Sequence, residues 1–246
     1  MCIAIVKPKG IETPSEKLLK TCWNNNPDGA GFCYNTKNGV IIHKGYLKFE
    51  DFYKDFKKHN YKNCDLIIHF RIATHGGVNK ECTHPFVISK NIEDLKKLHV
   101  KCKSAFVHNG IISGYGSRTD NGVSDTMDYV TKIIANIPYI NKTLLDNLAK
   151  EKSSRFAIIN KNNFVVGGAW IKDNGIYYSN DSYKERVVET PKATKKCTSH
   201  FSYTSKTCDF CGQKTYIPRY VWDTRYGEYY TLCGDCYKFA ESYINK

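Results

Sequence analysis

The chain has 246 residues, of which 41% are hydrophobic and 25% are charged, as in folded globular proteins. This composition excludes a mainly disordered or collagen-like chain. No apolar run approaches the roughly 18 to 20 residues that a membrane-spanning helix needs. The first ten residues also lack the basic leader and long apolar stretch of a secretory signal. We therefore expect a cytoplasmic protein with no membrane partner.

The formal net charge of +13 is in the range of proteins that bind nucleic acid. However, the chain contains no run of five or more like charges, and its lysines are scattered. A solvated, lysine-rich surface is therefore the favoured interpretation over a dedicated groove for a polyanion.

The first 190 residues alternate between strand-like and helix-like segments. In chain order, they predict a strand at 2–8, a helix start at 13–16, a hairpin at 29–46 and a helix at 49–60. They then predict two buried central strands at 64–73 and 103–111, a broken helical region at 125–150 and a strand meander at 155–180. Helices inserted between groups of strands predict an α+β fold with antiparallel sheets. A polar, lysine-rich stretch around Pro191 places a boundary near residue 190, between a domain at 2–190 and a module at 191–246.

Several residues of the first domain have the chemistry of an amide hydrolase. Removal of Met1 would leave Cys2 with a free α-amine, which gives a thiol nucleophile its own base. Arg71, at a predicted strand end, can bind a carboxylate through two hydrogen bonds. A side-chain amide followed by a glycine N–H, at Asn109–Gly110, can donate two hydrogen bonds to an oxyanion. Asp125 begins a predicted helix and is either its N-cap or the acceptor of a substrate ammonium group.

These residues belong to motifs that follow one another in a fixed order: Met-Cys at the start, NPDGAGFCY at 26–34, HFRIATHGG at 69–77 with His-Pro-Phe at 84–86, HNG at 108–110 and SDT at 124–126. The ordered set resembles the class II glutamine amidotransferase domain of the N-terminal-nucleophile hydrolases, from residue 2 to about 180. The resemblance implies a four-layer αββα sandwich.

The resemblance also implies a role for each residue. Cys2 would be the nucleophile, with Asn109 and Gly110 as the oxyanion-hole donors. The substrate would be L-glutamine. Arg71 would bind its α-carboxylate and Asp125 its α-ammonium group. Thr74 and His75 would lie in the same pocket loop as Arg71. The implied reaction is hydrolysis of the side-chain amide to glutamate and ammonia, through a thioester on Cys2.

Only about 66 residues follow residue 180, too few for the synthase domain that longer family members append. We therefore expect either a separate ammonia-accepting enzyme or a free-standing glutaminase. Two alternatives stay open at this point. The chain could be an N-terminal-Cys hydrolase of another amide, or a non-catalytic amidotransferase-like scaffold that binds nucleic acid or a protein through its C-terminal module.

The C-terminal module contains two CxxC motifs separated by 21 residues. Four thiolates that a hairpin brings together predict a closed, tetrahedral, structural zinc site, and the pattern resembles a zinc ribbon. The expected ligands are Cys208, Cys211, Cys233 and Cys236. Nearby aromatic and basic residues, including Arg219 and Arg225, suit nucleic acid or a protein partner equally well.

The remaining cysteines and histidines predict no further site. Four cysteines on apolar faces are interpreted as small core residues: Cys22, Cys33, Cys64 and Cys102. Three histidines lack partners at ligand spacing in the sequence and are interpreted as surface or core residues: His43, His59 and His99. His69, on the same strand face as Arg71, either lies beside the substrate pocket or only packs.

Overall fold

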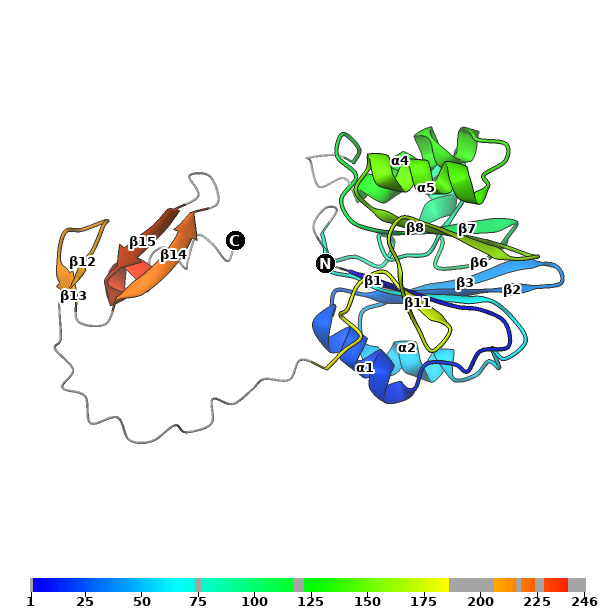
Figure 1. Ribbon diagram of the computed structural model, residues 1–246, viewed down its shortest axis with the longest axis horizontal. Helices are drawn as coiled ribbons and strands as arrows, with labels where there is room; N and C mark the ends of the chain where they lie inside the picture. Colours follow the sequence, from blue (N-terminus) through cyan, green and yellow to red (C-terminus); the bar gives the residue numbers. More distant parts are fainter. Residues whose placement is uncertain are drawn as a thin grey trace. The chain divides into compact units, whose positions relative to one another are not determined.

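Two antiparallel β-sheets form the frame of the N-terminal part of the chain (Figure 1). The computed structural model describes residues 2–73, 77–116, 122–185, 206–215, 218–223 and 228–238. The chain divides into two units, Met1–Val187 and Val188–Lys246. The boundary expected at residue 190 lies outside the described residues.

The larger sheet has seven strands in the order β10-β11-β1-β4-β2-β3-β6. Their bounds are β1 Ile3–Lys7, β2 Ala30–Thr36, β3 Gly39–Tyr46, β4 Leu66–Phe70, β6 His99–Cys102, β10 Ile171–Asp173 and β11 Ile176–Tyr178. The smaller sheet has four strands in the order β5-β7-β8-β9. Their bounds are β5 Phe86–Val87, β7 Ser104–Asn109, β8 Arg155–Asn160 and β9 Phe164–Gly167. The strand pairs of both sheets are antiparallel.

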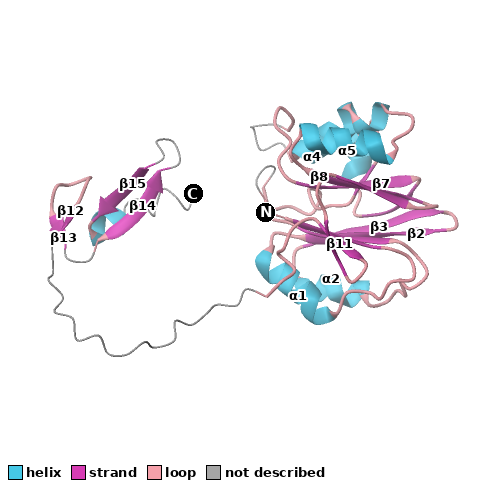
Figure 2. Cartoon of the chain, in the orientation of Figure 1, coloured by secondary structure: helices cyan, strands magenta, loops and turns pink. Residues whose placement is uncertain are grey.

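Helices cover the outer faces of the two sheets (Figure 2). Helices α1 (Glu16–Asn25) and α2 (Phe49–Phe56) pack on the seven-stranded sheet, and α4 (Asp125–Lys132) and α5 (Lys142–Glu151) on the four-stranded sheet. The short helix α3 (Ile92–Lys96) contributes Leu95 to the core of the second group. A 3-10 turn at Ile134–Asn136 follows α4.

The two-residue period of the strands sorts their side chains between the layers. In β1, Ile3 and Ile5 pack against α1 and α2, whereas Ala4 and Val6 pack between the sheets. Small and branched residues fill this central layer from both sheets: Ala4, Val6, Cys33, Val40, Ile42, Ile67, Ala105, Val107, Ala157 and Ile159. The buried residues therefore form three clusters, one on each side of the two sheets and one between them.

The predicted α+β class with antiparallel sheets is confirmed. The two buried segments predicted at 64–73 and 103–111 form β4 and β7, which are interior strands of their sheets. The meander predicted at 155–180 is divided between the two sheets, because the chain leaves the smaller sheet after Gly167. Gly168 makes this passage with a φ of +87°, and a Cβ there would lie 2.4 Å from the Ser154 carbonyl oxygen.

The described part of the C-terminal unit contains two small hairpins and a short helix at 234–238. Strand β12 (Lys206–Thr207) pairs with β13 (Lys214–Thr215), and β14 (Arg219–Asp223) pairs with β15 (Glu228–Leu232). In the part of the chain that the structure describes, no helix has the length and apolar character needed to cross a membrane.

Candidate active site and metal centre

Three of the predicted site residues lie at strand ends on the facing surfaces of the two sheets. Cys2 directly precedes β1, and Arg71 directly follows β4. Ile3 is paired with Phe70 in these antiparallel strands, so Cys2 and Arg71 occupy neighbouring register positions. Asn109 is the last residue of β7 in the other sheet. In the same three strands, Ala4, Ile67 and Val107 pack between the sheets. Cys2, Arg71 and Asn109 follow the same two-residue alternation, so they also lie on the inner faces.

Cys2 is held by contacts of its sulfur and its carbonyl group. The Ile72 N–H donates to the Cys2 Sγ over 3.2 Å, and the Asn180 side-chain amide donates to the Cys2 carbonyl over 2.6 Å. Burial raises the pKa of the Cys2 thiol above its ordinary value, although the Ile72 N–H and the charge of Arg71 oppose the shift. The thiol is therefore protonated at neutral pH, and it needs a base before it can act as a nucleophile.

Ser179 connects the two sheets beside Cys2. Its hydroxyl oxygen accepts from the Ala4 N–H over 2.8 Å and from the Asn109 side-chain amide over 2.7 Å. Its own N–H donates to the Ala4 carbonyl over 2.9 Å. One N–H of the Asn109 amide is thus fixed, and the amide has a second N–H that can reach a ligand.

Sequence reasoning missed Ser179 and Asn180. Their only sequence signal is a polar pair directly after the last buried strand of the domain, β11. Nothing in the spacing connects them with residues more than 170 positions earlier, because that contact arises only when β1 pairs with β11.

Arg71 is 4% exposed and is fixed by its main chain and its guanidinium group. Its N–H donates to the Gly29 carbonyl, and its Nη1 donates to the Gly77 carbonyl over 2.7 Å. The carboxylate of Asp28 accepts from the Ala73 N–H, which ties the segment after β4 to the loop before β2. Thr74 and His75, which were predicted to bind the substrate, lie outside the described residues.

Gly110 has a φ of +147°, a backbone conformation that favours glycine. A Cβ at this position would lie 2.4 Å from the Ser154 Oγ and 3.0 Å from the His108 Nε2. These two atoms lie 3.1 Å apart, and the other ring nitrogen of His108 lies 2.8 Å from the Thr126 Oγ1. Gly110 therefore permits the close packing that ties the end of β7 to α4.

Asp125 is the first residue of α4 and not its N-cap, because Ser124 caps the helix by accepting from the Met127 N–H. The Asp125 side chain accepts from the Ile112 N–H over 2.8 Å, from the Thr126 N–H over 2.7 Å and from the Thr126 hydroxyl over 3.2 Å. Its carboxylate thus anchors the segment that follows Gly110. An ionised carboxylate offers about four acceptor positions, so these three bonds leave about one position for a cation.

Three buried histidines lie next to these residues. The rings of His69 and His84 are 4.2 Å apart between centroids, and those of His84 and His108 are 6.3 Å apart. Burial lowers the pKa of His69 to about 3 and that of His108 to about 4, and it holds the pKa of His84 well below its usual range. All three are therefore neutral at physiological pH.

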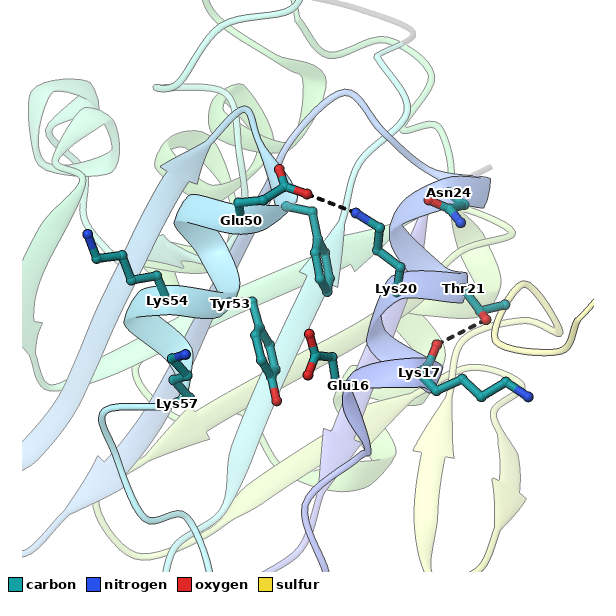
Figure 3. Close-up of a pocket in the computed structure, with 10 residues that line it drawn as sticks. Glu16, Lys17, Lys20, Thr21, Asn24, Glu50, Tyr53, Lys54 and Lys57 are labelled. Carbon is teal, nitrogen blue, oxygen red and sulfur yellow. Dashed lines mark hydrogen bonds and ion pairs between the residues drawn. The ribbon is translucent and has the colours of Figure 1, made fainter.

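A separate pocket of about 840 Å³ lies between α1 and α2. Figure 3 shows Lys20 and Glu50 facing each other there, with a distance of 3.0 Å between Nζ and Oε1. Because α1 and α2 cover the outer face of the seven-stranded sheet, this pocket lies on the opposite face from Cys2. Its lining includes the four lysines Lys17, Lys20, Lys54 and Lys57 and contains none of the predicted site residues.

In the C-terminal unit, the four predicted cysteine ligands converge. The sulfur atoms of Cys208, Cys211, Cys233 and Cys236 all lie within 4.8 Å of one another, so they could hold a metal ion. The Cys211 and Cys233 sulfurs are 3.8 Å apart. Metal–sulfur bonds of about 2.3 Å in a tetrahedron give an edge of about 3.8 Å, so the donor set fits such an ion. Hydrogen bonding, first from the Cys211 N–H, lowers the pKa of the Cys208 thiol to about 6, which favours the thiolate that a metal requires.

Compared with protein-family models and with curated proteins, the chain matches none. Function must therefore be inferred from the geometry of two groups of residues: Cys2, Arg71 and Asn109 in the N-terminal unit, and the four cysteines in the C-terminal unit.

The buried histidines predict a pH-dependent stability. An unfolded histidine has a pKa of about 6.5, so these groups take up protons on unfolding below that pH. We expect the free energy of unfolding to fall as the pH drops from about 6.5 towards 4, by up to about 1.4 kcal/mol per pH unit for each histidine. Denaturant titrations of the full chain between pH 7.5 and 4.5 measure the slope. A His84→Gln variant should have a shallower slope, and an unchanged slope would contradict the assignment.

The cysteine cluster predicts that metal removal unfolds the C-terminal unit. Without the ion, this unit loses the bonds that hold its two hairpins together, because its apolar core is small. A chelator should therefore make residues 206–238 sensitive to protease while the N-terminal unit stays resistant. Co²⁺ in the site should give thiolate-to-metal charge-transfer absorption, which Cys233→Ser should abolish and Cys102→Ser should preserve. Retention of the band in Cys233→Ser would exclude the four-cysteine site.

Proposed function

We propose that the N-terminal unit hydrolyses the side-chain amide of L-glutamine as a class II, N-terminal-nucleophile glutamine amidotransferase domain. The observation that carries the proposal is the convergence of Cys2, Arg71 and Asn109 at one end of the two facing sheets. The order of layers, with helices outside two packed sheets, supports the four-layer αββα sandwich of that family.

In the proposed reaction, the Cys2 thiolate attacks the amide carbonyl carbon of glutamine. The α-amine that Met1 removal exposes accepts the thiol proton. Asn109 and Gly110 donate N–H groups to the oxyanion of the tetrahedral intermediate. Ammonia then leaves with a proton from the amine, and water hydrolyses the γ-glutamyl thioester to glutamate and free thiol.

Recognition of the substrate follows from its charges. A zwitterionic amino acid needs a cation and an anion at its head group, and Arg71 and Asp125 supply them. Arg71 would bind the α-carboxylate through its guanidinium group. Asp125 would accept from the α-ammonium group. The released ammonia would pass to a separate acceptor enzyme or to solution.

For the C-terminal unit, we propose a zinc ribbon with a structural Zn²⁺. Four thiolates fill a tetrahedral coordination sphere and leave no position for a substrate, so this ion stabilises the fold and performs no chemistry. Any binding function of this unit would therefore lie on its surface. Phe210 and Tyr220 are 73% and 52% exposed, and the Lys206 Nζ lies 5.7 Å from the centroid of the Tyr220 ring. Exposed rings beside cations suit stacking on nucleic-acid bases or contact with a protein partner.

The proposed nucleophile can be tested without knowing the ammonia acceptor. The full chain is incubated with a diazo-ketone analogue of glutamine, and its intact mass is measured. We expect a chain without Met1 that carries one adduct, no adduct in Cys2→Ala, and a normal adduct in the control Cys22→Ala, which removes a buried core thiol. A retained Met1, or a processed chain without an adduct, would instead favour the non-catalytic scaffold or an amide other than glutamine.

The proposed oxyanion donors predict a specific kinetic defect. Asn109→Ala should lower kcat by about 10²- to 10³-fold with a much smaller change in KM, because the lost hydrogen bond forms mainly in the transition state. Ser179→Ala should cause a smaller loss of kcat, since it removes the group that orients Asn109. Glutamate release from glutamine measures both effects.

Asn162→Ala, in an exposed turn, is the matched control and should leave both constants unchanged. An Asn109→Ala enzyme with the kcat of the unsubstituted chain would remove Asn109 from the oxyanion hole.

A further inference from the structure

A second group of metal-binding side chains lies on the outer face of the seven-stranded sheet, near the end of α2. His43 is on β3, and His99 lies directly opposite on β6. Asp55 is in the last turn of α2, and His59 follows it by four residues. Spacing along the chain does not reveal this group, because strand pairing and helix packing bring its members together.

The distances within this group are those of a metal site. The ligand atoms of His43, Asp55 and His59 all lie within 4.8 Å of one another. The His43 Nδ1 is 2.8 Å from the Asp55 Oδ2 and 3.3 Å from the His99 Nδ1. Donors bound to a tetrahedral Zn²⁺ at about 2.0 to 2.1 Å are about 3.3 Å apart. Shifts of a fraction of an ångström to about one ångström would therefore place one ion among His43, Asp55 and His59, with His99 next to His43.

Neighbouring side chains already orient the donors. The His43 ring stacks on Phe32, with centroids 4.9 Å apart and an interplanar angle of 4°. Tyr46 donates a hydrogen bond to the Asp55 Oδ2, and the Tyr34 hydroxyl lies 3.4 Å from the His59 Nδ1. In established metal sites, hydrogen bonds from neighbouring groups hold the metal-binding side chains in place. The site also has access to solvent, since the His43 and Asp55 side chains are 17% and 18% exposed and His99 lies at the surface.

One cation competes for this carboxylate. The Lys58 Nζ lies 2.9 Å from the Asp55 Oδ1, and the Lys58 side chain is 60% exposed. Lys58 therefore holds the carboxylate oxygen that His43 does not contact. An ion at the Oδ2 leaves this pair intact and shares that oxygen with the Tyr46 hydroxyl, and an ion that takes both oxygens also displaces the exposed Lys58 ammonium group.

We propose that His43, Asp55, His59 and His99 bind a divalent transition-metal ion of the Zn²⁺ class. Imidazole nitrogens with a single carboxylate select Zn²⁺, Co²⁺, Ni²⁺ or Cu²⁺ over Ca²⁺ and Mg²⁺, which prefer oxygen ligands. The bound ion would join α2 to β3 and β6, which places a cross-link at the edge of the seven-stranded sheet. The site faces away from Cys2 and is independent of both the proposed glutaminase reaction and the four-cysteine cluster.

The test separates this site from the cysteines by its spectrum. The full chain is first loaded with one equivalent of Zn²⁺ to fill the thiolate site, and Co²⁺ is then titrated. We expect a second equivalent to bind, with d–d absorption but without the thiolate charge-transfer bands. Asp55→Asn should weaken this second affinity at least 10-fold. The matched control Asp51→Asn changes an exposed carboxylate one turn earlier on α2 and should leave the affinity unchanged.

His99→Gln keeps the proposal testable if Asp55→Asn disturbs α2, because His99 is an exposed residue on an edge strand. It should weaken the second Co²⁺ affinity, whereas Lys101→Gln on the same face of β6 should not. Added Zn²⁺ should also raise the Tm of the N-terminal unit in the unsubstituted chain more than in His99→Gln. Binding of only one equivalent per chain, or a second affinity that Asp55→Asn and His99→Gln leave unchanged, would overturn the proposal.

Discussion

Small and branched side chains fill the layer between the two sheets, and the candidate active site depends on this packing. Alanines contribute from three strands, β1, β7 and β8, at Ala4, Ala105 and Ala157. Short side chains let the sheets approach closely, so residues that extend beyond this apolar layer at its end meet across the interface. Cys2 and Arg71 extend from one sheet and Asn109 from the other. They meet only because the two sheets pack against each other.

Buried polar groups then fix the positions of the site residues through hydrogen bonds. Ser179 accepts hydrogen bonds from both sheets, and Asn180 fixes the carbonyl group of Cys2. Burial also lowers the pKa of Lys44 to about 7, and its side-chain nitrogen donates to the carbonyls of Glu81 and Leu95. Groups of this kind are costly to bury unless they are hydrogen-bonded, so each of them fixes the position of the loop that it contacts. The loop positions at the site are set in this way by main-chain partners.

Several features followed from local sequence because a local physical cause produces them. Alternating and continuous apolar runs specify strands, as in β4 and β7, and the break between α4 and α5 falls where Pro138 interrupts the helical pattern. The two CxxC motifs predicted four converging thiols, because a hairpin between two such pairs has few other arrangements. The identity of Ser124, and not Asp125, as the cap of α4 required the structure, since both residue types cap helices well.

Periodicity, short-range spacing and side-chain chemistry are local properties, so the α+β class, the cysteine cluster and the residue types of the candidate site could be predicted from the chain alone. Which distant residues meet depended on the tertiary structure. It joined Ser179 to Asn109 and Ala4, divided the last four strands of the domain between two sheets, and gathered His43, Asp55, His59 and His99 on one face. These contacts depend on strand order and on the packing of helices against sheets. No local pattern encodes them, since the free energy that selects them comes from burial summed over the whole unit.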